Sequence, residues 1–165
     1  MSILCVGSVA LDHLETPFGH AEEVLGGSAV FFGAAASLLA PVQMVGVVGS
    51  DYPMDKLRLL EPRGVDLSGI ETAQGESFRW KGRYSYDLND RVTVWTQLGV
   101  FAHFRPRIPE HFRDARVVFL GNIDPVLQLD VLDQVRRPEL VACDTMNFWI
   151  DGSRDALLEI GRAHV

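Results

Sequence analysis

The chain has 165 residues, enough for one domain with a substantial core, and its 47% hydrophobic and 22% charged residues are typical of a soluble globular protein. Fifteen basic residues stand against 22 acidic ones, and this net charge of -7 argues against a nucleic-acid-binding surface. The longest apolar run is too short to cross a bilayer and the amino terminus has no secretory pattern, so we expect a cytoplasmic protein without a membrane partner.

The first predicted element is a short apolar strand over Ile3-Leu4-Cys5-Val6-Gly7. Continuous hydrophobicity is typical of a strand that is buried on both faces, so we expect this strand at the centre of a sheet. Asp12 follows shortly afterwards, near the edge where open α/β sheets gather their ligands. Asp12 could accept hydrogen bonds from substrate hydroxyls there, or it could serve only as a turn or capping residue.

Residues 13–24 show no helical pattern and are expected to be extended. The stretch from Leu25 to Pro41 then predicts a helix, opened by the pair Gly26-Gly27 and ended by Pro41, with Ser28 as the residue that caps its first amides. Because the stretch is apolar on every side, we expect it to be covered all round. The helix start would offer free amides to a hydroxylated or anionic molecule, unless the glycines only turn the chain into a core helix.

A second buried strand is predicted over Val42 to Gly49, followed by a helix that begins at Asp51 and Pro53 and stops at Gly64. Strand and helix therefore alternate, which favours βαβ units and a mostly parallel sheet.

The pattern changes between Ser77 and Phe104, where aromatic residues alternate with polar ones on both sides of a turn at Asp87 to Asp90. This alternation predicts an antiparallel ribbon, with Gly82 as a possible bulge, that stands off the parallel sheet as a lid. Its aromatic rings could stack on a ligand or could simply pack.

A further buried strand is predicted at Val117 to Gly121 and another strand at Leu140 to Cys143, each followed by polar residues. Asp124 and Pro125 are suited to cap and begin a helix, and Ser153 opens a last one. Asn122 follows the first of these strands, and Asp144 and Asn147 follow the second. Together with Asp12 they predict a polar crevice at one edge of the sheet, which favours a small-molecule site.

The cysteines and histidines predict no metal site, because the five histidines are scattered and neither Cys5 nor Cys143 has a histidine nearby. Both cysteines lie in apolar runs and are expected to be buried, reduced thiols.

These residues resemble the amino-terminal half of the ribokinase-like, PfkB-type carbohydrate kinase family. The resemblance covers nearly the whole chain and rests on an ordered set of segments: Gly7-Ser8 with Asp12, Gly26-Gly27 with its small-residue helix, Val45 to Asp51, Arg63 to Asp66, and Asp144-Thr145-Met146-Asn147. It implies a ribokinase-like α/β fold, with helices on a mostly parallel sheet and a small antiparallel β lid at about residues 13–24 and 77–104.

The activity implied by the resemblance is ATP-dependent transfer of a phosphoryl group to a hydroxymethyl group of a sugar or nucleoside. On the same basis Asp12 would hold substrate hydroxyls, and Gly26 and Gly27 would contact the substrate through their backbone. We include Ser28, Phe31 and Asn122 in the expected substrate site, with Asp144 and Asn147 on the phosphate side. A lid that excludes water would favour transfer to the substrate over hydrolysis of ATP.

Two residues depart from the pattern of ribokinases proper, in which asparagine is common two positions before the aspartate and four positions after the second glycine. Ala10 and Phe31 stand at these places. The loss of polar groups and the added ring favour an acceptor that is less hydroxylated than ribose or that carries an aromatic group.

The family's catalytic base lies in a Gly-Ala-Gly-Asp type motif that this sequence lacks. The chain ends at Gly161 to Val165, where a further strand would begin, so we expect a single partial domain, 1–165, that is incomplete at its carboxyl terminus. ATP and Mg²⁺ are expected for the full-length enzyme, with neither bound by this half alone, and the chain by itself is expected to be inactive.

A second hypothesis is a non-catalytic module that binds small molecules, or that forms a homodimer through the exposed ribbon edge. A dinucleotide-binding domain is less consistent with the sequence, because no Gly-x-Gly-x-x-Gly follows the first strand.

Overall fold

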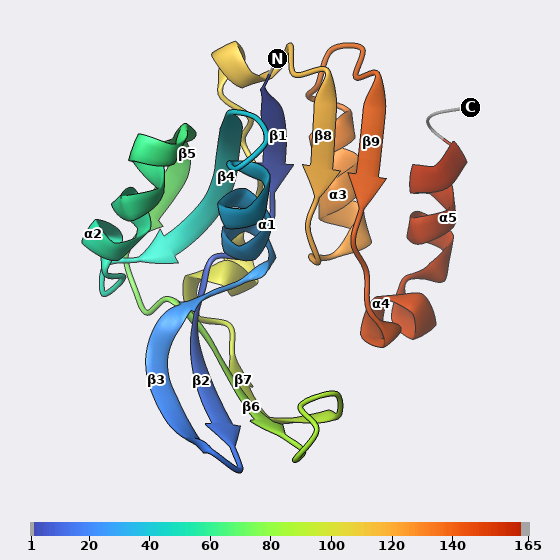
Figure 1. Ribbon diagram of the computed structural model, residues 1–165. Helices are drawn as coiled ribbons and strands as arrows, with labels where there is room; N and C mark the ends of the chain where they lie inside the picture. The colour runs from blue at the N-terminus through green and yellow to red at the C-terminus, as the bar shows by residue number, and fades with distance from the viewer. Residues whose placement is uncertain (1, 163–165) are drawn as a thin grey trace.

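The computed structural model describes residues 2–162. A five-stranded parallel sheet forms the core, and a four-stranded second sheet extends from the end where the core strands finish (Figure 1). The strand order is β5-β4-β1-β8-β9 in the core sheet and β3-β2-β6-β7 in the second sheet. The strands are β1 (Ile3–Val6), β2 (Ala10–Thr16), β3 (Gly19–Gly26), β4 (Val42–Gly49), β5 (Val65–Ala73), β6 (Phe78–Tyr84), β7 (Arg91–Gln97), β8 (Val117–Leu120) and β9 (Leu140–Cys143). The helices are α1 (Ser28–Ala36), α2 (Met54–Leu57), α3 (Pro125–Leu132), α4 (Asn147–Gly152) and α5 (Arg154–Arg162), with 3₁₀ turns η1 (Arg58–Arg63), η2 (Gly99–His103) and η3 (Glu110–Phe112).

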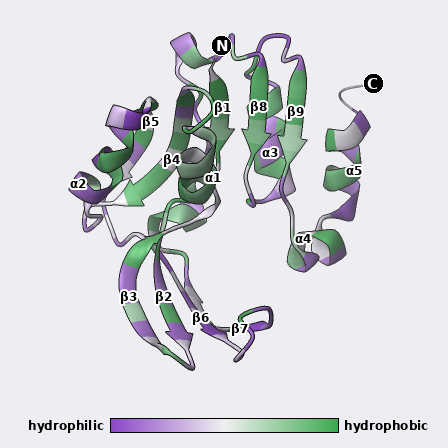
Figure 2. Ribbon diagram, viewed as in Figure 1, coloured by the Kyte–Doolittle hydropathy of each residue, from purple (hydrophilic) through white to green (hydrophobic). Residues whose placement is uncertain are grey.

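Strand β1 is central in the core sheet and is buried on both faces, as its apolar run predicts. Leu4 and Val6 pack in the cluster that includes residues of α3 and α5, whereas Cys5 packs in the cluster with α1 and α2. Helices therefore cover both faces of the sheet, and hydrophobic residues run along its strands (Figure 2). The expected mostly parallel α/β architecture is confirmed.

Helix α1 lies on one face of the core sheet and is not covered all round, so that expectation is wrong. Ala29, Val30, Gly33 and Ala36 face the core, but Phe31 is 61% exposed. The apolar pattern could not reveal this, because within residues 2–162 the helix has a neighbouring layer on only one side.

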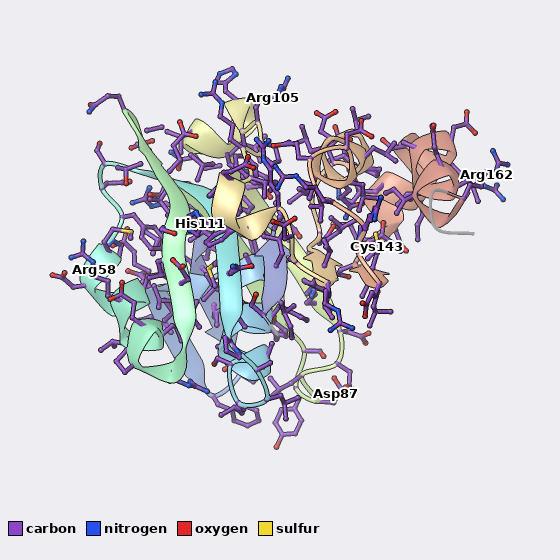
Figure 3. The ribbon with its side chains drawn as sticks, turned by 90° about the horizontal axis from the view of Figure 1, so that it is seen from above. Arg58, Asp87, Arg105, His111, Cys143 and Arg162 are labelled. Atoms are coloured by element: carbon purple, nitrogen blue, oxygen red, sulfur yellow. The ribbon has the colours of Figure 1, made fainter. Side chains whose placement is uncertain are left out.

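The second sheet consists of two antiparallel hairpins, β2–β3 and β6–β7, joined by parallel pairing of β2 with β6. The register of β6 with β7 shifts between Lys81 and Gly82, which confirms the predicted bulge. Asp87, at the tip of the β6–β7 turn, is labelled in Figure 3.

Asp51 does not start a helix. Helix α2 begins three residues later, at Met54, and continues through η1 to the predicted stop at Gly64, which has a φ of 85°. Asp51 instead accepts hydrogen bonds from the amide and hydroxyl of Ser77, at 2.8 and 2.6 Å, and forms an ion pair with Arg79 at 2.7 Å. It thus joins the end of β4 to the start of the second sheet. Partial burial acts to raise the pKa of Asp51, but these hydrogen bonds hold that pKa below its usual value.

Three other features differ from the sequence-based expectations or lie beyond what can be described. Strand β5 was not predicted, because only its first residues alternate between buried and exposed. Cys143, labelled in Figure 3, is exposed on the edge strand β9 rather than buried. At the carboxyl end, Gly161 and Arg162 belong to α5, and Ala163 to Val165, where we expected a further strand, lie outside the described residues. None of the helices between residues 2 and 162 is long and apolar enough to span a membrane.

Candidate functional site

The end of β1 and the start of α1 are joined by two serines. The Ser8 hydroxyl accepts a hydrogen bond from the Ser28 amide at 3.0 Å, and the Ser8 carbonyl accepts one from the Ala29 amide at 3.0 Å. In return, the Ser8 amide donates to the Ser28 hydroxyl at 3.2 Å. Ser28 therefore does not cap α1, and the first two helix amides are not free for a ligand, because Ser8, which lies between β1 and β2, accepts hydrogen bonds from both of them.

Gly27 allows this junction to form. Its φ of 97° and ψ of 151° lie in a region that residues with a side chain rarely adopt. A Cβ atom on Gly27 would lie 2.3 Å from the Ser8 carbonyl oxygen, far inside contact distance. The second glycine of the pair is thus required by the close approach of two backbone segments.

Gly26 has a different role, because it makes room for the Asp12 side chain. Asp12 lies on β2, paired with Val24 of β3 and Trp80 of β6, and its side chain is directed at the Gly26 backbone on the neighbouring strand. A Cβ atom at Gly26 would come within 2.1 Å of Asp12 Oδ2. Asp12 therefore lies beside the glycine pair, although it belongs to the second sheet and not to the core sheet.

Asp12 is a mostly buried residue whose carboxylate has no protein partner in the described chain, although its oxygens are not fully enclosed. Only 7% of the residue is exposed, and within residues 2–162 no group donates a hydrogen bond to it. Burial without compensation raises the pKa of Asp12 to about 6. A carboxylate in this state can accept hydrogen bonds from hydroxyl groups of a bound molecule.

The carboxyl end of β8 reaches the same junction through Gly121, whose amide donates to the Val6 carbonyl at 2.7 Å. A Cβ atom at Gly121 would lie 2.6 Å from the Ser28 hydroxyl. The next residue is Asn122, whose side-chain oxygen accepts a hydrogen bond from the Trp149 indole at 2.9 Å. Asn122 is therefore held by α4 with its amide nitrogen as the group left to donate.

The remaining predicted site residues are exposed. Phe31 projects from α1 with 61% of its surface accessible, and both Asp144, just after β9, and Asn147, the first residue of α4, are exposed. The Asp144 backbone is fixed, because its amide donates to the Leu120 carbonyl at 2.8 Å and its carbonyl accepts from Gln128 at 3.0 Å. No hydrogen bond joins Asp144 or Asn147 to Asp12 within the described chain.

Asp124 is a capping residue, as its position before Pro125 indicates. Its carboxylate accepts a hydrogen bond from the Val126 amide at 2.9 Å at the start of α3. The polar residues that follow β8 therefore divide between helix capping and the junction with α1.

Sequence reasoning overlooked Tyr52. This tyrosine is 6% exposed, and its hydroxyl is buried without a hydrogen-bond partner in the described structure. Burial and the nearby Asp12 charge both raise the pKa of its phenol. A single tyrosine after Asp51 carries no pattern, so only the three-dimensional structure identifies it.

An open cavity of about 600 Å³ lies elsewhere, at the far end of the second sheet. It is lined by residues at and beside the β2–β3 turn, including Glu15 of β2 and His20 of β3, and by Arg83 and Tyr84 of β6. None of the residues at the Asp12 and Gly27 junction lines it. Among residues 2–162, no group of three or more His, Cys, Asp or Glu side chains is arranged to hold a metal ion.

Comparison with known proteins agrees with this fold. No protein-family model matches the chain. A cytidine kinase from Thermococcus kodakarensis is 28% identical over 138 residues, which are 82% of this chain and 49% of the relative. The solved structure of a nucleoside kinase from Methanocaldococcus jannaschii, an archaeal member of the ribokinase family, has a TM-score of 0.71 and 22% identity over 96% of this chain and 57% of that one.

A candidate ribokinase II from Escherichia coli, solved in complex with ATP and Mg²⁺, has a TM-score of 0.71 and 14% identity over 96% of this chain and 58% of that one. The chain thus has the ribokinase-like fold, and the resemblance noted in its sequence is confirmed at this level. In sequence it is similar to a nucleoside kinase in particular. The chain spans about half the length of the curated relative that it matches.

Proposed function

We propose that this chain provides the acceptor-binding part of an ATP-dependent kinase that phosphorylates a nucleoside or a related sugar. The observation that carries the proposal is the buried Asp12 carboxylate, which has no protein partner in the described residues and lies against Gly26. An unpartnered buried carboxylate costs stability, which is understandable if a ligand hydroxyl completes its hydrogen bonds. The likeness to a cytidine kinase supports a nucleoside as the acceptor.

In this proposal Asp12 accepts hydrogen bonds from acceptor hydroxyls, and the backbone at Gly26 and Gly27 lies against the acceptor. Ser28 has a supporting part, because its hydroxyl is engaged with Ser8. Asn122 can donate from its amide nitrogen, and the exposed ring of Phe31 can contact the outer side of the acceptor. Asp144 and Asn147 are assigned to the phosphate side. The second sheet then acts as the lid that excludes water.

We further propose that the catalytic base and the residues that bind ATP and Mg²⁺ are not among these 165. The support is that the chain spans 49% of the cytidine kinase that it matches. Phosphoryl transfer needs a positioned base and electrostatic stabilisation of the phosphates. The chain by itself is therefore expected to bind the acceptor without phosphorylating it.

Cytidine is expected to bind the purified chain and to perturb NMR signals at Asp12 and Gly26, with no phosphorylated product when ATP and Mg²⁺ are added. Gly26→Ala should abolish this binding, because its Cβ would displace the Asp12 carboxylate. Gly152→Ala is the matched control, since a Cβ there meets nothing within 4 Å and binding should be retained. Equal cytidine binding by all three proteins would place the acceptor elsewhere, and no binding of nucleoside or ribose by the unmodified chain would refute the proposal.

A second candidate function is a module that forms a homodimer through the second sheet. Strand β7 favours it, because it is an edge strand with all seven residues exposed, including Val92, Val94 and Trp95. Sedimentation velocity tests this candidate. We expect a dimer that Val94→Lys dissociates, and a monomer at every concentration of the unmodified chain would eliminate it.

A further inference from the structure

The second sheet projects from the core, and its attachment lies at its base. Strands β2, β3, β6 and β7 extend beyond the ends of the core strands, and among residues 2–162 no helix runs alongside them (Figure 1). At the base, the ring of Phe78 in β6 stacks on Phe101 in η2, with 5.1 Å between the ring centroids. The angle between the two sheets therefore depends on contacts made at this base.

Arg79 of β6 joins three elements there. Its Nη2 atom lies 2.7 Å from Asp51 Oδ2, just after the end of the core strand β4. The same atom lies 3.1 Å from Glu23 Oε1 on β3, to which Arg79 Nε also donates at 3.3 Å. We call Arg79, Asp51 and Glu23 the Arg79 clamp, because one guanidinium connects two strands of the second sheet to a strand of the core.

The Arg79 clamp differs from an ordinary surface ion pair. Exposed pairs contribute little, because water screens the charges and both side chains lose freedom. The Arg79 side chain is only 16% exposed, and its planar donors hold two carboxylates in fixed directions. Arg83, on the same strand, also pairs with a carboxylate, that of Glu15, at 2.8 Å. Its side chain is 64% exposed, however, and both partners belong to the second sheet, so this pair does not reach the core.

The core end of the Arg79 clamp is fixed by Ser77, which is fully buried just before β6. The Ser77 hydroxyl accepts a hydrogen bond from the Gly49 amide at 3.0 Å and donates one to Asp51 at 2.6 Å. The Asp51 carboxylate is thereby held at the end of β4. Rotation of the second sheet about this point would separate Arg79 from Asp51 and break their ion pair.

The other end of the Arg79 clamp lies beside Asp12. Glu23 has a φ of 49°, which residues with a side chain rarely adopt, and the register of β2 with β3 shifts just after Asp12. Such a conformation persists where surrounding contacts hold it. Asp12 pairs with Val24 of β3 and with Trp80 of β6, the residues that follow Glu23 and Arg79. The Glu23–Arg79 ion pair therefore ties together the two strands that flank Asp12.

We infer that the Arg79 clamp restrains the angle between the second sheet and the core sheet, and thereby fixes the position of Asp12 relative to the start of α1. Arg79 is a positioning residue in this inference, because it acts through the strands on either side of Asp12. The restraint on the angle does not depend on the proposed function, and only its effect on acceptor binding does.

The test measures residual dipolar couplings of the backbone amides by NMR in the unmodified chain and in Arg79→Gln. In the unmodified chain, one alignment tensor should fit the amides of both sheets. In Arg79→Gln the second sheet should need a separate tensor of smaller magnitude, because it then samples a range of angles to the core. This variant should also bind cytidine severalfold more weakly, since Asp12 is no longer held in one place.

Arg83→Gln is the matched control, because it removes an ion pair of the same strand that stays within the second sheet. It should keep the single tensor and the cytidine affinity of the unmodified chain. A single tensor in Arg79→Gln would overturn the inference, and so would an equal loss of order in both variants. If Arg79→Gln fails to fold, Glu23→Gln, which cuts only the arm to β3, is judged by the same two readings. Failure of the unmodified chain to bind any nucleoside would remove the proposed function and leave the restraint intact.

Discussion

Asp12→Asn is expected to stabilise the chain at neutral pH and, at the same time, to abolish its binding of cytidine. Burial raises the pKa of Asp12 from its ordinary 3.8 to about 6, so holding this group ionised in the folded state costs free energy. The difference of about two pH units corresponds to at most about 3 kcal/mol. Asparagine has nearly the same shape and no charge, and it therefore avoids this cost.

The effect has a defined pH window. Between about pH 4 and 6 the folded chain binds more protons at Asp12 than the unfolded chain, so the free energy of unfolding should fall as the pH rises through this range. Asp12→Asn should lack that decline. Urea unfolding at pH 4 and pH 7 measures it: the two proteins should be similar in stability at pH 4, and Asp12→Asn should be more stable by about 1–3 kcal/mol at pH 7. A variant that is less stable at pH 7 would mean that protein groups satisfy the carboxylate.

Gly27→Ala is expected to unfold the chain or to destabilise it by roughly 3–5 kcal/mol. Two effects combine, because the φ of 97° is unfavourable for alanine and the new Cβ would lie 2.3 Å from the Ser8 carbonyl. The obstacle is backbone, so no side-chain rotation can relieve it. Moving that backbone would break the hydrogen bonds by which Ser8 holds the Ser28 and Ala29 amides. Circular dichroism during thermal unfolding measures the loss.

Gly161→Ala serves as the control for this substitution. Gly161 lies in α5, where an added Cβ would meet nothing within 4 Å, so alanine there should raise stability by up to about 1 kcal/mol through helix propensity. A Gly27→Ala chain that melts within a degree or two of the unmodified protein would contradict the close approach of Gly27 to Ser8.

The core sheet was largely predictable from the sequence, because its inner strands are continuous apolar runs bounded by glycine or polar residues. Val42–Gly49 and Leu140–Cys143 coincide with the predicted strands. Local chemistry also placed the cap at Asp124 and the helix stop at Gly64, since both depend on residues adjacent in sequence. Strand β5 was not predicted because it is an edge strand, and its few buried side chains leave a weak hydrophobic pattern in the sequence.

The contacts that build the candidate site could not be read from local patterns. Whether Ser8 or Ser28 caps α1 depends on how closely β1 approaches the helix, and the partners of Asp51 lie 26 or more residues away. The burial of Tyr52 and the exposure of Cys143 likewise depend on neighbours from other elements. Sequence reasoning identified Asp12 and the glycine pair as candidates, and the structure brings them together, but their role in binding stays a prediction.

Asp12 belongs to the second sheet, whereas Gly27 connects β3 of that sheet to α1 on the core sheet. A molecule that touches both Asp12 and the start of α1 would bridge the two sheets. Any rotation of one sheet against the other would then change the distance between its two contact points. By thermodynamic linkage, such a molecule favours those angles between the two sheets at which it binds most tightly. Acceptors of different length would then favour different angles between the two sheets.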